Sequence, residues 1–296
     1  MKKILAIILM VVLALGMTAC ASSEKPVAEA SDSKAVEEST SGTDSNEAEA
    51  QPEATEKLVI KVGLDDAYPP FEYHDEATNN LIGFDIDFTQ ALGEEIGAEI
   101  EYVSTAWDGI FNGVNTGQYD MIVSCVSITP ARIEEFEMSN PYLANGIVIV
   151  SAADGEQATS IEQLAGKKVG VQLETTADIA AKKFIDQGTD IQLLQFDSVM
   201  EAFAALKGGS IEYIMVDSSV GGFYISNDSE SFNISSGLLS NEPIGVCMAK
   251  GNTELSEKVN AGIKALQENG KMTELSQKWF SADFATNIDS EIKVIE

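Results

Sequence analysis

The chain has 296 residues and a formal net charge of −30, from 48 acidic and 18 basic side chains. Such an acidic protein cannot replace the counterions of a phosphate backbone, so we expect no nucleic-acid partner. The charge also disfavours adsorption of the folded part on an anionic membrane. Cys125 and Cys247 lie in separate apolar contexts without CxxC or Cys/His spacing, which predicts no disulfide framework and no zinc site. We expect two free buried thiols, although a Cys125–Cys247 pair stays open, and neither a metal nor a cofactor.

Residues 1–20 have the features of an export signal. Two lysines precede the apolar stretch 4–15, which is too short to span a bilayer comfortably and leads into a polar segment. Cys20 follows a small residue at the end of this core, a pattern that resembles a bacterial lipobox. By this resemblance, Cys20 becomes the first residue of the mature chain, carries lipid including palmitate, and anchors the protein at the extracytoplasmic face of the cell membrane. The alternative is an ordinary signal peptide cleaved near Ala19 or Ala21.

Residues 21–56 contain no aromatic residue and almost no large aliphatic one. Such a segment buries too little apolar surface to offset its ordering entropy, so we predict a disordered acidic tether. Its reach is on the order of 30 Å for a flexible chain of this length. We expect it to hold the folded part away from the anchor.

From Lys57 onward, short apolar runs alternate with helical patterns, which predicts an α/β fold. The expected strands are 58–64, 100–103, 119–123, 146–150, 169–172, 191–196, 211–216 and 244–249. Three later helices have polar starts and glycine stops, namely Ser160 in a Ser-x-x-Gln box to Gly166, Ser198 in a Ser-Val-Met-Glu box to Gly208, and Thr253 to Gly270. The first helix has an apolar face made by Phe84, Phe88, Ala91, Leu92 and Ile96. Roughly 240 residues exceed one layered core, so we expect two lobes.

Arg132 is the one arginine in the chain, since the other basic residues are all lysine. The planar guanidinium of arginine can form two parallel hydrogen bonds with a carboxylate, which the ammonium of lysine cannot do. The segment predicts a helix with Thr129 as N-cap and Pro130 at its first position, which places Arg132 near free backbone amides and the hydroxyls of Ser124 and Ser127. We interpret this region as an anion site. The alternative is a surface arginine in a composition that avoids arginine.

The chemically suggestive residues follow the carboxyl ends of the expected strands, where open α/β sheets bind ligands. They are Asp65 and Tyr68, the segment 124–132, the segment 173–176, and Asp217. We therefore expect one cleft. Asp217 and the Thr175–Thr176 pair have simpler alternatives as helix caps.

Seven motifs follow one another along the chain, namely Gly63-Leu-Asp-Asp-Ala-Tyr-Pro-Pro-Phe-Glu72, Gly83-Phe-Asp-Ile-Asp87, Trp107-Asp-Gly-Ile, Asp120 through Arg132, Val169-Gly-Val-Gln-Leu, Asp217, and Leu266-Gln-Glu-Asn-Gly-Lys to Trp279-Phe280. Their sequences and order resemble the polar amino-acid binding proteins of ABC importers, family 3 of the type II periplasmic binding proteins. The resemblance covers residues 57–280 and is specific for the family but weak for the ligand.

The resemblance implies a two-lobed clam-shell with two hinge crossings. Lobe 1 then comprises residues 57–144 and 246–296, and lobe 2 comprises residues 145–245. Hinge strands are expected near 144–147 and 241–245. A monomer would close around an amino acid and present it to a membrane permease, without catalysis.

The resemblance also assigns the ligand contacts. Arg132 corresponds to the arginine that binds the ligand α-carboxylate, helped by Ser127, Thr175 and Thr176. Asp217 corresponds to the acid that receives the α-ammonium from the opposite lobe. The segment at Ser124 and Cys125 supplies further acceptors.

Selection of the ligand side chain is expected from Asp65, Tyr68, Trp107 and Gln172. The two aromatic rings offer faces for a guanidinium, an ammonium or a planar amide, although both rings have core packing as their alternative. A basic amino acid is favoured over glutamine or cystine.

Two residues depart from the family pattern. Glu174 stands where glycine is common, and Cys125 stands where serine, glycine or alanine is usual. A carboxylate beside the expected carboxylate site is unfavourable unless it faces solvent or a ligand cation. Glu174 also raises a less favoured alternative, a dehydratase-like enzyme with Glu174 as general acid.

Overall fold

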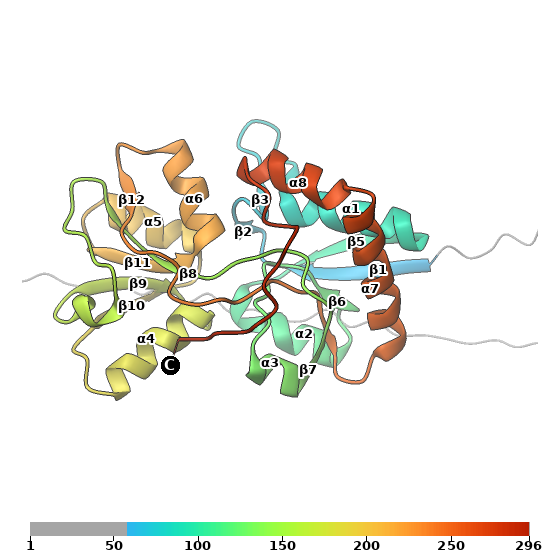
Figure 1. Cartoon of the computed structure of the whole chain (residues 1–296), viewed down its shortest axis with the longest axis horizontal. Coiled ribbons are helices and arrows are strands. Elements are labelled where there is room, and N and C mark those ends of the chain that lie inside the picture. Colours follow the sequence, from blue (N-terminus) through green and yellow to red (C-terminus); the bar gives the residue numbers. More distant parts are fainter. Residues whose placement is uncertain (1–57, 296) are drawn as a thin grey trace, which may run out of the picture. The chain divides into compact units, whose positions relative to one another are not determined.

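The computed structural model describes residues 58–295. Its strands form two five-stranded sheets and one three-stranded sheet (Figure 1). The predicted signal segment, its Cys20 and the predicted tether lie outside the described residues. Within the described range, no helix has the length and apolar character needed to cross a membrane.

The first five-stranded sheet has the order β5-β1-β6-β13-β7. Its strands are β1 (Leu58–Leu64), β5 (Ala98–Ser104), β6 (Met121–Ile122), β7 (Phe136–Met138) and β13 (Cys247–Ala249). Strand β1 pairs in parallel with β5 and β6, whereas β13 runs antiparallel to β6 and β7. Its helices are α1 (Phe84–Ile96), α2 (Ile110–Thr116), α3 (Pro130–Glu135), α7 (Thr253–Glu268), α8 (Lys271–Phe280) and the 3₁₀ helix η1 (Trp107–Gly109). We call this assembly the first lobe.

The second five-stranded sheet has the order β10-β9-β11-β8-β12. Its strands are β8 (Ile147–Ala152), β9 (Lys168–Gln172), β10 (Gln192–Phe196), β11 (Tyr213–Asp217) and β12 (Phe232–Ile234). Its helices are α4 (Thr176–Asp186), α5 (Val199–Lys207), α6 (Ser218–Asn227) and the 3₁₀ helix η2 (Ile161–Leu164). Strand β9 is parallel to β10 and β11, and β8 is antiparallel to β11 and β12. We call this assembly the second lobe.

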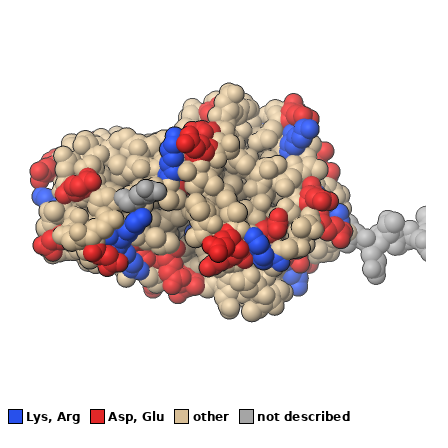
Figure 2. Space-filling model, turned by 60° about the horizontal axis from the view of Figure 1, so that its bottom comes forward, with Lys and Arg blue, Asp and Glu red and all other residues tan. Residues whose placement is uncertain are grey.

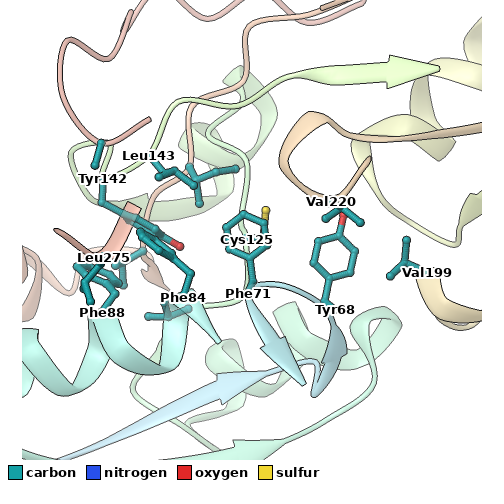
Figure 3. Packing of buried hydrophobic residues seen from close by; sticks show 14 of the residues in the cluster. Tyr68, Phe71, Phe84, Phe88, Cys125, Tyr142, Leu143, Val199, Val220 and Leu275 are labelled. Atoms are coloured by element: carbon teal, nitrogen blue, oxygen red, sulfur yellow. The ribbon is translucent and has the colours of Figure 1, made fainter. Parts of the chain in front are cut away.

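A small three-stranded antiparallel sheet follows β1 and carries residues that contact the second lobe. It consists of β2 (Ala67–Tyr68), β3 (Glu72–His74) and β4 (Leu81–Ile82). Figure 3 shows Phe71 and Tyr68 on this segment, with Tyr68 pointing toward Val199 and Val220 of the second lobe. One hydrophobic cluster therefore extends from the first lobe into the second.

Helix α1 packs the apolar face that the sequence predicts. Phe84, Phe88 and Leu92 are fully buried, and the Phe88 ring stacks on Tyr142 with 4.4 Å between centroids (Figure 3). The helix ends at Gly97, whose φ of 73° is in the left-handed region that glycine tolerates. Gly262 of α7 faces this helix, where an added Cβ would lie 2.5 Å from Leu92. The absence of a side chain there lets α1 and α7 approach closely.

The predicted helix starts differ in outcome. The Ser198 capping box is formed, because its side chain accepts from the N–H of Glu201 and Glu201 reaches back to the Ser198 N–H. The prediction of a capping box at Ser160 is wrong. The Ser160 side chain makes no cap hydrogen bond, and the segment forms only the short 3₁₀ helix η2. The Gln163 side chain instead accepts a hydrogen bond from the Thr159 N–H at 2.6 Å. That competing bond removes the second half of the box.

Two predicted strands are shorter than expected. The segment 119–123 forms only β6, and the segment 244–249 forms only β13. Ile244 instead makes single bridges to Ser127 and Leu143. These bridges tie the connection between the lobes to the segment that precedes Arg132.

The last described residues cross toward the second lobe (Figure 1). Lys293 forms a two-bond antiparallel bridge with Asn241, and Ile295 packs against a hydrophobic cluster of the second lobe. The expected boundary placed the whole segment 246–296 in the first lobe, so its last residues differ from that expectation. The reason is apolar burial, since Ile295 finds its hydrophobic neighbours across the connection.

Candidate functional site

The expected ligand residues converge on a small cavity between the two lobes. The cavity, which we call the inner cavity, has a volume of about 10 Å³, room for roughly one water molecule. It is lined by Tyr68, Trp107, Ser124, Cys125, Ser127, Arg132, Gln172, Thr175, Thr176 and Asp217. The structure thus brings together ten of the eleven expected residues, and Asp65 lies behind them. That they bind a ligand stays a prediction.

Arg132 is held at the start of α3 as the sequence predicts. Thr129 is the N-cap and accepts a hydrogen bond from the Arg132 N–H at 3.2 Å, and Pro130 is the first helical residue. The guanidinium lies 4.8 Å from the Phe111 ring centroid and 5.5 Å from that of Trp107. Its Nη1 donates to the Ser127 carbonyl at 2.9 Å. These contacts fix the plane of the fork.

The Arg132 guanidinium has unused donors. A guanidinium has five N–H groups, and the structure gives one side-chain hydrogen bond to it. Among residues 58–295, no carboxylate lies within ion-pair distance of it. Burial lowers the pKa of Arg132, which reflects the cost of desolvating this cation. A bound anion would lower that cost.

Asp217 ends β11 on the opposite side of the inner cavity. It is the N-cap residue of α6, as the simpler alternative expects, but its side chain makes no cap hydrogen bond. Its Oδ1 accepts from Asn145 Nδ2 at 2.5 Å, and its Oδ2 accepts from the Tyr68 hydroxyl. The Cys125 thiol lies 3.7 Å from the same oxygen. Burial raises the pKa of Asp217.

Asp65 does not line the inner cavity. It is 6% exposed, and its Oδ2 accepts from Gln172 Nε2 at 2.8 Å while its Oδ1 accepts from the Ala67 N–H. Burial raises its pKa. Asp65 and Gln172 therefore form a second hydrogen-bonded connection between the lobes, beside the contact between Tyr68 and Asp217.

Trp107 packs in the hydrophobic core and also reaches the inner cavity. It belongs to a hydrophobic cluster with Ile110 and Val114, and its ring meets Phe111 edge to face at 5.4 Å. It also lines the inner cavity, and its buried Nε1–H has no hydrogen-bond partner in the described part of the chain. Core packing therefore accounts for the ring but leaves the indole N–H unsatisfied.

The segment 174–176 begins α4. Thr175 is its N-cap, since its hydroxyl oxygen accepts from the Asp178 N–H, so the capping alternative holds for this residue. Glu174 has a φ of 60°, which explains why glycine suits this position. The Glu174 N–H donates to Asp178 at 2.9 Å, and its exposed side chain faces a second cavity.

Two buried carboxyl groups support the segment 124–125 from below, and the sequence analysis missed this role. Ser124 donates to Glu72 at 2.8 Å, and the Cys125 N–H donates to Asp85 at 2.8 Å. Tyr142 also donates to Asp85. Burial raises the pKa of Asp85 to about 7 and that of Glu72 well above its usual range. Both acids stand in the motifs quoted above, but burial is not visible in a motif.

Asn145 and Glu242 are the other residues that the sequence analysis missed. Asn145 is buried and orients Asp217, while its carbonyl accepts from the Glu242 N–H at 2.9 Å. Glu242 is 1% exposed. Both lie in the segments expected as hinges, which is the one signal in the sequence that pointed to them.

A wider cavity of about 590 Å³ lies beside the inner cavity, and we call it the outer cavity. It opens between α3 and α4, the two helices at the lower edge of Figure 1. Arg132 and Thr176 line both cavities. No group of three or more residues suited to hold a metal ion occurs among residues 58–295. Cys125 and Cys247 are free and buried, as predicted.

The chain matches the family described as bacterial extracellular solute-binding proteins, family 3, over residues 60–282. It is 30% identical over 229 residues to the L-cystine-binding protein TcyJ of Escherichia coli (strain K12), covering 77% of this chain and 85% of that protein. It is also 30% identical over 234 residues to the putative ABC transporter arginine-binding protein 2 of the same strain, covering 77% and 93%. Both relatives are named as binding proteins.

A solved structure agrees in fold. The P235GK mutant of ArgBP from T. maritima superposes with a TM-score of 0.71 at 34% identity, covering 76% of this chain and 96% of that one. The two-lobed α/β fold of type II periplasmic binding proteins is therefore confirmed. The family model covers both lobes and every residue of the inner cavity. The chain belongs to the bacterial extracellular solute-binding proteins, family 3.

Proposed function

We propose that this protein captures an amino acid between its lobes and delivers it to an ABC importer. The observation that carries the proposal is the placement of opposite charges around one cavity, with Arg132 on the first lobe and Asp217 on the second. A zwitterion buried between lobes needs both charges paired, because an unpaired buried ion costs several kcal/mol. The relatives named for cystine and arginine support an amino acid as the ligand.

Closure follows from the placement of the two charges. Arg132 offers free donors to the α-carboxylate, and Asp217 offers an acceptor to the α-ammonium. Because the partners belong to different lobes, both are satisfied only when the lobes close, so binding shifts the population toward the closed state. The closed pair of lobes is the surface that a permease would recognise.

The proposed ligand is a polar L-amino acid, with a basic one ahead of glutamine or cystine. The acidic chain and the aromatic rings at the cavity favour a cation. The inner cavity of about 10 Å³ has no room for an amino-acid side chain, so the lobes must separate to admit the ligand. No chemical step is proposed, because Glu174 lines the outer cavity and does not line the inner one.

A thermal-shift screen tests the proposal. The purified full chain in detergent is heated with each common L-amino acid and with cystine, and one or a few of them should raise the midpoint of unfolding in a concentration-dependent manner. A screen in which none of them shifts the midpoint contradicts the function. Glucose and inorganic phosphate serve as ligands that should have no effect.

Membrane attachment through Cys20 is part of the same proposal. The lipobox pattern supports it, and the acidic composition leaves lipid as the means of attachment. Cys20→Ala should move the protein from the membrane fraction to the medium or the periplasm. Cys125→Ala should stay in the membrane fraction and is the matched control. Retention of the Cys20→Ala protein in the membrane contradicts the anchor.

A further inference from the structure

The chain passes between the lobes a third time after its last helix. The first two crossings lie between β7 and β8 and between β12 and β13. The third is the segment 284–295, which we call the strap. In Figure 1 it runs in dark red from α8 across the middle of the molecule and ends beside α4. The match to the solute-binding family ends at residue 282, so the strap is a feature of this chain beyond the family model.

The strap begins on the first lobe. The Phe284 N–H donates to the hydroxyl of Ser276, a fully buried residue of α8, at 2.8 Å. The Phe284 carbonyl accepts from the N–H of Ala144, in the first crossing, at 2.7 Å. The next residue, Ala285, is buried in the large hydrophobic cluster. This end of the strap is therefore fixed to α8 and bonded to the first crossing.

The other end of the strap is bonded to Asn241, in the second crossing. The backbones of Asn241 and Lys293 exchange two hydrogen bonds, of 2.8 and 2.9 Å. The Asn241 side chain adds two more, since its Nδ2 donates to the carbonyls of Asp289 and Glu291 at 3.1 and 2.6 Å. The two side-chain bonds require an amide, because a carbonyl oxygen can only accept. Asn241 is therefore the residue through which the second crossing holds the strap.

Apolar contacts hold the end of the strap. Ile295 packs against the second-lobe cluster that includes Ala180 of α4. Val294 and Ile295 also line the outer cavity together with Ile179 of α4. Burial of this apolar surface stabilises the contact. The strap thus starts on one lobe and ends on the other.

Charge contributes little to this attachment. Lys293 pairs with Glu291 at 3.0 Å, but both residues belong to the strap and are 58% and 70% exposed. On the face shown in Figure 2, which is the lower side of Figure 1 turned forward, small groups of acidic and basic side chains lie next to one another. The charges on that face are therefore mixed. The contacts that fasten the strap are the hydrogen bonds of Asn241 and the packing of Ile295.

Separation of the lobes must disturb the strap. Its start is covalently continuous with α8 of the first lobe, and its end packs on the second lobe, in a cavity that opens between α3 and α4. When α3 and α4 move apart, the strap must bend or release Asn241 and Ile295. Either change costs free energy, and this cost favours the arrangement in which the strap is fastened.

We propose that the strap is a third hinge segment that favours the closed lobes, and that Asn241 is the positioning residue that fastens it. The inference rests on the proposed function, because a ligand enters and leaves only when the lobes separate. The strap then increases the closed population of the unliganded protein and slows ligand release.

Distances between spin labels test the strap without a ligand. The labels are attached at Asn115→Cys on α2 and Asp186→Cys on α4, both exposed positions, in the full Cys20→Ala chain, whose other native cysteines are buried. Asn241→Asp replaces the donating amide by a carboxylate of the same shape. Pulsed electron paramagnetic resonance should show the ratio of long to short distances rising about tenfold, the effect of losing the two side-chain hydrogen bonds. Removal of residues 288–296 should raise the same ratio at least as much, and it decides the test if Asn241→Asp does not fold.

The rate of ligand release is the second measurement. Radiolabelled L-arginine and L-cystine are bound to the purified full chain in detergent and displaced by an excess of the unlabelled amino acid. Release should be about tenfold faster from Asn241→Asp and from the chain without residues 288–296, because opening no longer disturbs a fastened strap. A residue that served only overall stability would lower the midpoint of unfolding without changing this rate.

Asn227→Asp is the matched control. Its Nδ2 also donates to a backbone carbonyl, that of Phe223 at 2.8 Å, but both residues lie in α6 of the second lobe. This variant loses the same kind of hydrogen bond and gains the same charge as Asn241→Asp. It should keep the wild-type distances and the wild-type release rate.

The strap and the proposed function fail in different ways. An unchanged ratio of distances, or an unchanged release rate in a variant that still binds, overturns the strap and leaves the proposed function standing. Equal shifts in Asn227→Asp and Asn241→Asp also overturn it, because the added charge would then be their cause. If no amino acid binds, the proposed function is overturned and the distances alone decide the strap: a tenfold rise supports it, and an unchanged ratio excludes it.

Discussion

The two charged groups of the inner cavity are held in different ways. Asp217 accepts hydrogen bonds on both oxygens, from Asn145 and from Tyr68 of the other lobe. Arg132 is oriented by aromatic rings and one carbonyl, and its remaining donors have no carboxylate in the described chain. Within the described chain, Arg132 therefore keeps donors for a carboxylate, whereas Asp217 is hydrogen-bonded on both oxygens and links the lobes. Ligand affinity should depend more on Arg132 than on Asp217.

The largest expected effect comes from Arg132→Lys. An ammonium cannot reproduce a bidentate fork stacked on Phe111, so affinity for the amino acid should fall about 100-fold or more. The midpoint of unfolding without ligand should change little, because Arg132 forms no ion pair among residues 58–295. Calorimetry measures the first quantity and a thermal scan the second. Near-native affinity would remove Arg132 from the clamp.

Asp217→Asn should have a smaller effect on binding, about tenfold, because the neutral amide can still accept from the ligand ammonium with its one oxygen. Since Asp217 also connects the lobes through Tyr68, this variant should shift the unliganded protein toward open conformations. Small-angle X-ray scattering of the unliganded protein would detect an increased radius of gyration. Tyr68→Phe is the matched control, because it removes the same contact and leaves the carboxylate. Equal losses of affinity in Arg132→Lys and Asp217→Asn would contradict the expectation that ligand affinity depends more on Arg132 than on Asp217.

The C-terminal segment offers a separate way to weaken the connection. Removal of residues 288–296 takes away the Asn241–Lys293 bridge and the packing of Ile295. The free energy of unfolding should fall by about 1–3 kcal/mol, from lost burial and hydrogen bonds. Denaturant titration measures this change, and removal of Glu296 alone is the control. An unchanged free energy of unfolding would show that the crossing segment contributes nothing to the fold.

A smaller, pH-dependent effect is expected from Glu72 and Asp85 beneath the site. Both pKa values are raised by burial, that of Asp85 to about 7, so the folded state binds more protons than the unfolded chain between about pH 4 and 7. Stability from this pair is therefore present at low pH and lost as the pH rises through about 7. The midpoint temperature of unfolding should therefore decrease when the pH is raised from 6 to 8.

Glu72→Gln should flatten this dependence. The amide keeps an oxygen for Ser124 and a permanent N–H donor that can face Asp85, in place of the proton that titrates. Thermal scans of wild type and variant at pH 6, 7 and 8 measure the difference. Glu94→Gln, an exposed change on α1, is the control. Parallel pH profiles for wild type and Glu72→Gln would exclude the buried pair as their cause.

The local sequence was sufficient for much of the fold. Thr129, Pro130 and Arg132 begin α3 as predicted, and the Ser198 box forms, because capping depends on residues within four positions of one another. The Ser160 box failed for a reason equally local, since Gln163 bonds to the Thr159 N–H instead. Strand lengths were less predictable, because pairing partners such as those of Ile244 lie far away in the chain.

The family, the α/β alternation and the set of residues around the inner cavity could be read from motifs and from the rule that ligand residues follow strand ends. Which of those residues keep unused hydrogen-bonding groups became known from the fold alone. Asp65 is buried and hydrogen-bonded to Gln172, whereas Glu242 is buried and its Oε2 has no hydrogen-bond partner among residues 58–295. Burial and pairing are properties of contacts between distant segments, and no single segment encodes them.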